Sequence, residues 1–306
     1  MDLARLLAPR DPDLARIARE LHAARPDLQA AYADPDGAGF RQWLAVNGPL
    51  EDARVARHFP ALPPDELRAS ACGGATLQTH LYTGAEDFRS VGELYETFAE
   101  RPLEALRSVL DFGCGCGRLL RWFQTALPHV ALHGADVRKA SVAWCRQHLR
   151  GTFVDNGTLP PLPLADESVE LTVALSVFSH LSLQQNLAWL RELVRVTRRD
   201  GLLLLTTHGA FALAACARHA HLQQLLEMTP AQARAALRAL HRDRFVHVEV
   251  AASTHAIADG VATDYGNAFF GERFVQERWS AVAEVLGCVP VGMSLFQDYH
   301  VLRPRR

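Results

Sequence analysis

The sequence predicts an α/β protein built on a mostly parallel β-sheet. From residue 108 onward, short apolar stretches alternate with amphipathic helical patterns. A glycine-rich turn follows the first of these stretches, where an open parallel sheet binds its ligands. Residues 1–104 carry helical patterns instead. We therefore expect βαβ units with right-handed crossovers, preceded by a helical extension that covers the sheet as a lid.

The extension begins with a well-marked helix. Asp11 caps it, Pro12 takes its first position, and one apolar face follows at Leu14, Ile17, Ala18 and Leu21. Shorter helices are expected around Phe40 and in "LPPDELRAS". Glycines at 73, 74 and 84 favour a loop over residues 71–85. The last helix, "AEDFRSVGELYETFAERP", carries an apolar stripe that consists of Phe88, Val91, Leu94, Tyr95 and Phe98.

The second part, residues 105–306, alternates strands and helices. Strands are predicted at 108–112, 129–135, 152–154, 169–175 and 201–207, with helices at 117–126, 138–149 and 183–198. Residues 208–270 interrupt this order with two more helical stretches and a loop that carries Gly260 and Gly266. This insertion is expected to form a cap. A helix at 272–286 and short strands near 288–295 and 297–303 complete the prediction.

Composition describes an ordinary globular protein of 306 residues, with 49% hydrophobic and 22% charged residues. A net charge of −2 disfavours nucleic acid and anionic membranes as partners. The N-terminal sequence lacks the features of a signal peptide, and the most apolar run, 201–217, is too short to span a bilayer. The six cysteines show no disulfide or zinc spacing. We therefore expect a cytoplasmic protein.

The glycine-rich turn "VLDFGCGCGR" is the most informative motif. Its glycines permit a tight turn between a strand and a helix, whose first N–H groups face a ligand. Asp136 ends the next strand and is placed to accept ribose hydroxyls. The loop, this second acid and the order of elements together predict a nucleotide-containing ligand.

The segment resembles motif I of the class I S-adenosylmethionine-dependent methyltransferases, an acid followed by G-x-G-x-G, which stands here as Asp111, Gly113, Gly115 and Gly117. Dinucleotide dehydrogenases differ in the second half of the loop. "VDNGTLPPLPLADESVELTVALSVFSHL" and "WLRELVRVTRRDGLLLLTTHG" resemble later segments of the family, with Glu170 replacing an aspartate and Asp200 replacing a proline. The extension and "GERFVQERWSAVAEV" resemble a bacterial branch associated with glycan and natural-product gene sets.

This resemblance implies a Rossmann-like fold, a seven-stranded sheet with an antiparallel last strand, and S-adenosylmethionine as cofactor. Arg118 is the candidate for the ligand's carboxylate, with a solvated surface arginine as the alternative. Tyr82 is the candidate for its sulfonium. The full set of implied cofactor residues is Asp111, Gly113, Cys114, Gly115, Gly117, Arg118, Asp136, Val137, Asn156, Gly157, Ser176 and Tyr82.

Candidate catalytic residues follow the fourth and fifth predicted strands. His208, His180 and Ser176 lie where a side chain could accept a proton from an acceptor hydroxyl or amine. The alternative for each histidine is a packing or capping role. Cys114 and Cys116 are interpreted as small packing residues rather than a metal or redox site, since no partner cysteine pair exists. No metal is expected.

The sequence thus favours a methyltransferase that acts on the oxygen or nitrogen of a small molecule or sugar in biosynthetic metabolism, as a possible homodimer. One alternative is an enzyme that cyclises S-adenosylmethionine to azetidine-2-carboxylate and methylthioadenosine. A non-catalytic binding module is a further alternative, which the intact glycine loop disfavours.

Overall fold

The computed structural model describes residues 11–72, 76–250 and 266–305. Its centre is a sheet with five parallel strands, which run in the order β3-β2-β1-β4-β5. These strands are β1 (Ser108–Phe112), β2 (Ala131–Asp136), β3 (Thr152–Asp155), β4 (Val169–Ala174) and β5 (Thr197–His208). β1 and β4 are buried along their whole length, which explains their uninterrupted apolar sequences.

Four further strands extend the sheet beyond β5. The last strand, β9 (Gln297–Pro304), pairs antiparallel with β5 and with β8 (Ala283–Met293). β7 (Gly266–Phe270) pairs with β5 only at His208, and β6 (Phe245–Glu249) pairs with β7. Because His208 also pairs with Gln297 of β9, the β6–β7 hairpin lies on the other side of β5, beyond the end of β4. The predicted mostly parallel sheet with an antiparallel last strand is confirmed, but the described residues form nine strands rather than the predicted seven, because the β6–β7 hairpin adds two.

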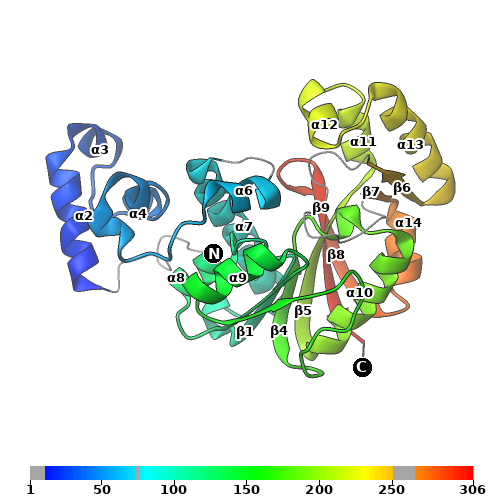
Figure 1. Ribbon diagram of the computed structural model, residues 1–306, viewed down its shortest axis with the longest axis horizontal. Helices are drawn as coiled ribbons and strands as arrows, with labels where there is room; N and C mark the ends of the chain where they lie inside the picture. The colour runs from blue at the N-terminus through cyan, green and yellow to red at the C-terminus, as the bar shows by residue number, and fades with distance from the viewer. Residues whose placement is uncertain (1–10, 73–75, 251–265, 306) are drawn as a thin grey trace.

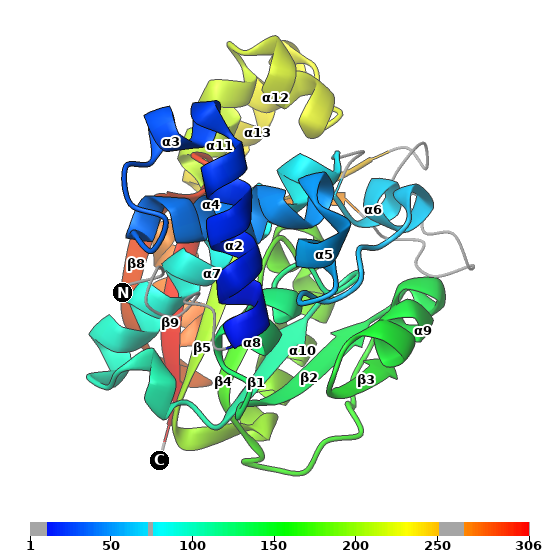
Figure 2. The same cartoon turned by 90° about the vertical axis from the view of Figure 1, so that its left-hand side faces the viewer.

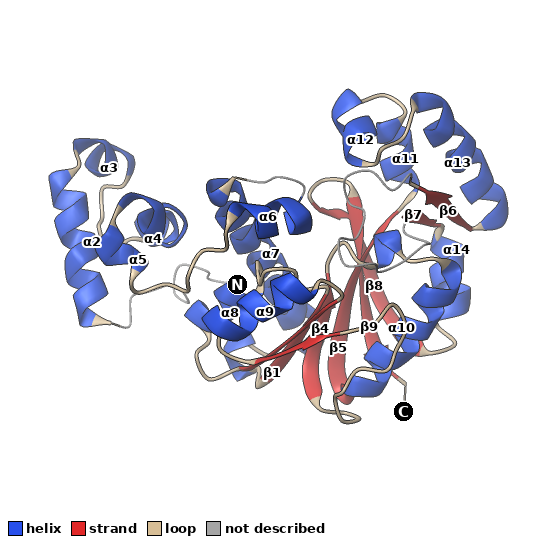
Figure 3. Cartoon of the chain, in the orientation of Figure 1, coloured by secondary structure: helices blue, strands red, loops and turns tan. Residues whose placement is uncertain are grey.

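Helices cover both faces of this sheet (Figures 1 and 3). One face packs against α7 (Leu77–Ala99), α8 (Leu120–Ala126) and α9 (Lys139–His148), joined by η1 (Leu103–Ala105). The other packs against α10 (Leu183–Val196), α14 (Glu272–Phe274) and the π-helical turn η3 (Val275–Trp279). The carboxyl ends of β1, β2 and β4 are therefore flanked by two helical layers.

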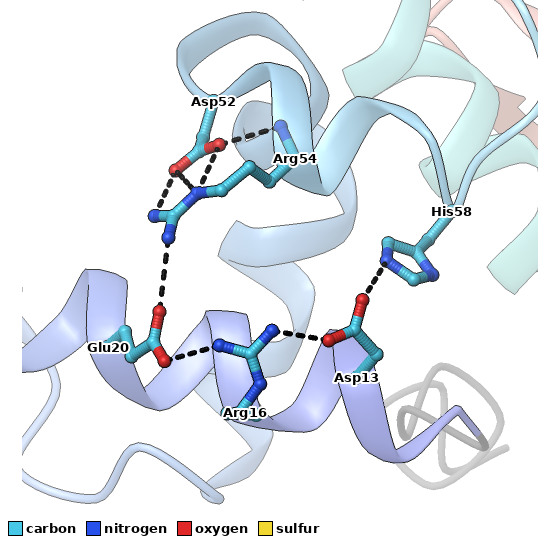
Figure 4. Close-up of polar contacts among 6 residues, drawn as sticks. All are labelled: Asp13, Arg16, Glu20, Asp52, Arg54 and His58. Carbon is cyan, nitrogen blue, oxygen red and sulfur yellow. Dashed lines mark hydrogen bonds and ion pairs between the residues drawn. The ribbon is translucent and has the colours of Figure 1, made fainter.

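The N-terminal helices form a separate group with its own apolar cluster, seen at the left of Figure 1 and turned toward the viewer in Figure 2. It comprises α2 (Pro12–Ala24), α3 (Pro26–Ala31), α4 (Ala38–Glu51) and α5 (Ala53–Ala56). As predicted, the Asp11 side chain caps α2. Arg54 joins Asp52 and Glu20 in an exposed ion-pair network (Figure 4). Such exposed pairs contribute little to stability.

The insertion forms a third group. Helices α11 (Ala210–Cys216), α12 (Ala220–Leu225) and α13 (Pro230–Asp243) share an apolar cluster with Phe269 of β7. They lie beside the hairpin in Figure 1. The sequence interpretation expected two helices here and missed the hairpin. The predicted loop at Gly260 lies outside the described residues.

Three other predicted boundaries were wrong. Residues 77–85 belong to α7 rather than to a loop, and α6 (Asp65–Cys72) takes up the start of the predicted loop. The glycine turn continues to Leu119, so α8 starts at Leu120 and has seven residues. The predicted helix 272–286 stops at Trp279, because β8 begins at Ala283 and pairs with β9. No helix among the described residues is long and apolar enough to cross a membrane.

Candidate active site

The glycine loop has a backbone that favours glycine at three positions. Gly113, Gly115 and Gly117 have φ values of 83°, 51° and 79°, in the left-handed region. A Cβ atom on Gly113 would lie 2.2 Å from a methyl carbon of Val177, which follows β4. The loop therefore packs directly on the turn after β4. The predicted display of helix N–H groups is wrong in detail, because α8 begins three residues after Gly117.

Asp136 joins this loop to the end of β2. Its Oδ2 accepts a hydrogen bond from the Gly115 N–H at 2.7 Å, and its Oδ1 accepts one from the Arg138 N–H at 2.8 Å. Burial raises the pKa of the Asp136 carboxyl, and these backbone bonds, with that from Val137, oppose the rise. The acid expected to meet a ribose therefore lies against the loop and orders it.

Asp111 is the most strongly perturbed acid of the site. It is 4% exposed, and burial raises its pKa to about 7. Arg118 opposes this rise, while the negative charges of Asp136 and Asp87 add to it. Arg118 itself is ion-paired with Asp87 of α7 and is mostly buried. Arg118 is thus not the solvated surface arginine that the sequence left open; whether it also contacts a ligand carboxylate stays a prediction.

Asn156 and Gly157 follow β3, as the sequence predicted, and lie next to Asp136. The Asn156 N–H donates to the Asp136 carbonyl at 3.1 Å, and its Nδ2 donates to the Gly157 carbonyl at 2.8 Å. Its Oδ1 is buried and has no hydrogen-bond partner among the described residues. A buried acceptor without a donor is costly, so this atom suits a ligand amine.

Ser176 occupies the turn after β4 with a φ of 56°. Its N–H donates to the Thr206 hydroxyl at 2.8 Å, and its Oγ accepts from Gln297 Nε2 at 2.7 Å. A serine in the left-handed region is strained, and such strain gathers at functional sites. Ser176 therefore connects β4, β5 and β9 beside the glycine loop.

His180 and His208 come together at the carboxyl edge, with ring centroids 5.9 Å apart. His208 is 2% exposed and lies 5.5 Å from each of the Phe269 and Phe296 rings. Burial lowers the pKa of His208 well below its ordinary value, so the ring is neutral. This environment favours the packing role for His208.

His180, in the 3₁₀ turn η2 (Phe178–His180), is half-buried. Its Nδ1 lies 3.0 Å from the Gly266 carbonyl oxygen. Because a carbonyl only accepts, Nδ1 carries the proton in this hydrogen bond. Of the two histidines, His180 is thus the less buried, and its role as a proton acceptor stays a prediction.

The remaining residues discussed in the sequence analysis are Tyr82 and the two loop cysteines. Tyr82 lies on α7 rather than in a loop, and 55% of its surface is exposed. Cys114 and Cys116 are buried, and a Cβ atom on Gly134 would lie 3.0 Å from the Cys114 sulfur. Both cysteines pack beneath the loop, as the sequence analysis expected.

Sequence reasoning missed three polar residues of this region: Asp87, Gln297 and Tyr299. Tyr299 of β9 is buried, and its hydroxyl has no partner among the described residues. Asp87 had one visible signal, since an acid directly before Phe88 interrupts the apolar face of α7. Gln297 and Tyr299 carried no such signal.

The polar groups around the loop fit S-adenosylmethionine, which the resemblance implies. Asp136 accepts backbone bonds from Gly115, Arg138 and Val137, and a carboxylate offers about four acceptor positions, so a ribose hydroxyl fits beside these bonds. Asn156 Oδ1 is a buried acceptor in need of a donor such as the adenine amine.

Comparison with known proteins identifies the segment that contains this site. Residues 109–201 match a family model described as a methyltransferase domain. A probable S-adenosylmethionine-dependent methyltransferase of Mycolicibacterium smegmatis is 33% identical over 120 residues. That match covers 39% of this chain and 44% of the relative, so the chain spans less than half of the relative's length. Family and cofactor agree with the expectation from the glycine loop.

Solved structures with related folds include an S-adenosylmethionine-dependent methyltransferase of Clostridium acetobutylicum, with 8% identity and a TM-score of 0.47. The alignment covers 72% of this chain and 93% of that chain. Another is the 1,6-didemethyltoxoflavin-N1-methyltransferase of Burkholderia thailandensis, with bound 1,6-didemethyltoxoflavin and S-adenosylhomocysteine. It shows 13% identity and a TM-score of 0.46, over 72% of this chain and 78% of that chain.

Proposed function

We propose that the protein transfers the methyl group of S-adenosylmethionine to an oxygen or nitrogen of a small molecule, because residues 109–201 match a methyltransferase domain. One observation carries the proposal. The glycine loop, which matches the family motif, and Asp136, which ends the next strand, are joined by a hydrogen bond at the carboxyl edge of the sheet.

Different residues of the site would bind the cofactor and accept the proton. S-adenosylmethionine, when bound, supplies an electrophilic methyl group. Gly113, Gly115 and Gly117 let the backbone approach the ligand, and Asp136 and Asn156 accept hydrogen bonds from it. His180 accepts the proton of the acceptor at Nε2, with its tautomer held by Gly266.

A small acceptor is favoured over a polymer. The net charge of −2 gives no attraction to nucleic acid, and the insertion helices stand beside the carboxyl edge as a cap. An acceptor made in biosynthetic metabolism, such as a sugar or natural product, is consistent with the resemblance of the extension. A cytoplasmic location and a homodimer stay predictions.

The test begins with the purified protein and S-adenosylmethionine alone. We expect little turnover without an acceptor, and S-adenosylhomocysteine only when a panel of sugars, hydroxylated compounds and amines is added, measured by mass spectrometry. Formation of methylthioadenosine without an acceptor would contradict methyl transfer and would favour intramolecular cyclisation of the cofactor.

A further inference from the structure

The last helix of the extension contributes a buried acid to the glycine loop. Asp87 of α7 is 6% exposed, and its Oδ2 accepts a hydrogen bond from Nη1 of Arg118, the residue after Gly117. A buried carboxyl is costly unless it is paired. α7 lies before the segment 109–201 that matches the family, so the family motif does not account for Asp87.

α7 is fixed against the loop at this point by a second contact. Gly84 lies three residues before Asp87, on the same helix face. A Cβ atom on Gly84 would lie 2.8 Å from the Arg118 carbonyl oxygen and 2.6 Å from Nε1 of Trp122. The helix therefore contacts Arg118 at its backbone through Gly84 and at its guanidinium through Asp87. Such double contact holds the side chain of Arg118 in one place.

The charges around Arg118 match a zwitterion. The Arg118 guanidinium pairs with Asp87 and attracts the carboxyl group of Asp111, and the negative charge of Asp136 also acts on Asp111. The Tyr299 hydroxyl, which is buried and has no partner among the described residues, feels the charges of both Asp87 and Arg118. An α-amino acid complements this set, because its ammonium pairs with the carboxylates and its carboxylate with the guanidinium and the hydroxyl.

Resting on the proposed function, we propose that Asp87 is a positioning residue that holds the Arg118 guanidinium for the amino-acid carboxylate of S-adenosylmethionine. A guanidinium has five N–H donors in a planar fork, so the bond to Asp87 through Nη1 is compatible with a second acceptor. Holding Arg118 in place before the ligand arrives reduces the entropy lost on binding. The extension therefore completes a site that the family motif begins.

The experiment compares two ligands by isothermal titration calorimetry. One is S-adenosylmethionine, and the other is its decarboxylated analogue, which lacks only the carboxylate. We expect Asp87→Ala to lower the affinity for S-adenosylmethionine about tenfold and the affinity for the analogue less than about twofold. Asp87→Asn should restore part of the loss, because its amide oxygen still accepts the bond from Arg118.

Arg118→Met is the second variant, with thermal unfolding curves recorded for every protein. Arg118→Met should also lose affinity for S-adenosylmethionine but not for the analogue. The double variant with Asp87→Ala should bind S-adenosylmethionine no more weakly than Arg118→Met alone. If folded Asp87 variants lost affinity equally for both ligands, or lost none, the positioning role would be overturned and the proposed function would stand. A wild-type protein that binds neither ligand would instead contradict the proposed function, and this inference with it.

Discussion

At the scale of single residues, the site is governed by acids held in an apolar environment. Asp111, Asp136 and Asp87 all have a raised pKa, and burial is the first cause for each. Buried acids without full compensation reduce stability, so their retention at a ligand edge points to binding. A ligand that brings positive charge would offset part of that cost.

Replacing Asp111 with asparagine should change how stability depends on pH. The pKa of this acid rises from 3.8 to about 7 on folding. The contribution of Asp111 to the free energy of unfolding is therefore complete below pH 3.8. It falls by about 1.4 kcal/mol per pH unit above that value and is lost as the pH rises through about 7. Relative to wild type, the variant should gain stability as the pH rises from about 4 to about 7, measured by urea denaturation.

The comparison with wild type is needed because buried histidines make stability rise with pH, whereas Asp111 makes it fall. Burial lowers the pKa of His300 from 6.5 to about 4, so its contribution is lost as the pH falls below 6.5. His300 is common to both proteins, and its effect cancels in the difference. Parallel pH profiles for the wild type and Asp111→Asn would contradict the raised pKa.

The tautomer of His180 gives a second prediction at this scale. Its bond to the Gly266 carbonyl requires the proton on Nδ1. A long-range ¹⁵N–¹H correlation spectrum at alkaline pH should therefore show a neutral Nδ1–H form that disappears in His180→Gln. A proton on Nε2 instead would remove His180 as the proton acceptor.

At the scale of elements, α7 is as much a part of the site as the glycine loop. Gly84→Ala would place a methyl group 2.8 Å from a backbone oxygen of the loop. Although alanine favours helix, we expect the variant to lose about 1–3 kcal/mol of stability from overpacking. Tyr82→Ala, at an exposed position of the same helix, should change stability by less than about 0.5 kcal/mol. Urea denaturation of both variants measures this, and equal stabilities would contradict the close contact.

The same contact explains why sequence reasoning misplaced the start of α7. Gly84 was interpreted as a loop residue, yet it lies inside the helix because Trp122 and Arg118 leave no room for a side chain. By contrast, β1 and β4 were predicted within a residue, because strands buried on both faces have uninterrupted apolar sequences. β6 is only half-buried, and this weak pattern left the hairpin undetected.

At the scale of the whole molecule, the apolar clusters of the described residues mark three parts: the sheet with its two faces, the N-terminal helices and the insertion. The sheet carries the cofactor edge, the N-terminal helices form a separate group, and the insertion helices stand beside the edge (Figure 1). The cofactor end was predictable because its motif is local and its residues face one turn. The positions of Asp87, Tyr299 and Gln297 were not, since each depends on packing between elements that are distant in the chain.

Binding of S-adenosylmethionine by the glycine loop and Asp136 is measured by calorimetric titration of the wild-type protein and of Asp136→Ala. We predict binding to the wild type and a loss of about 1–3 kcal/mol in the variant, the cost of hydrogen bonds left without a partner. No binding to the wild type would show that the loop does not hold this cofactor, and an unchanged affinity in a folded Asp136→Ala variant would show that Asp136 does not contact it.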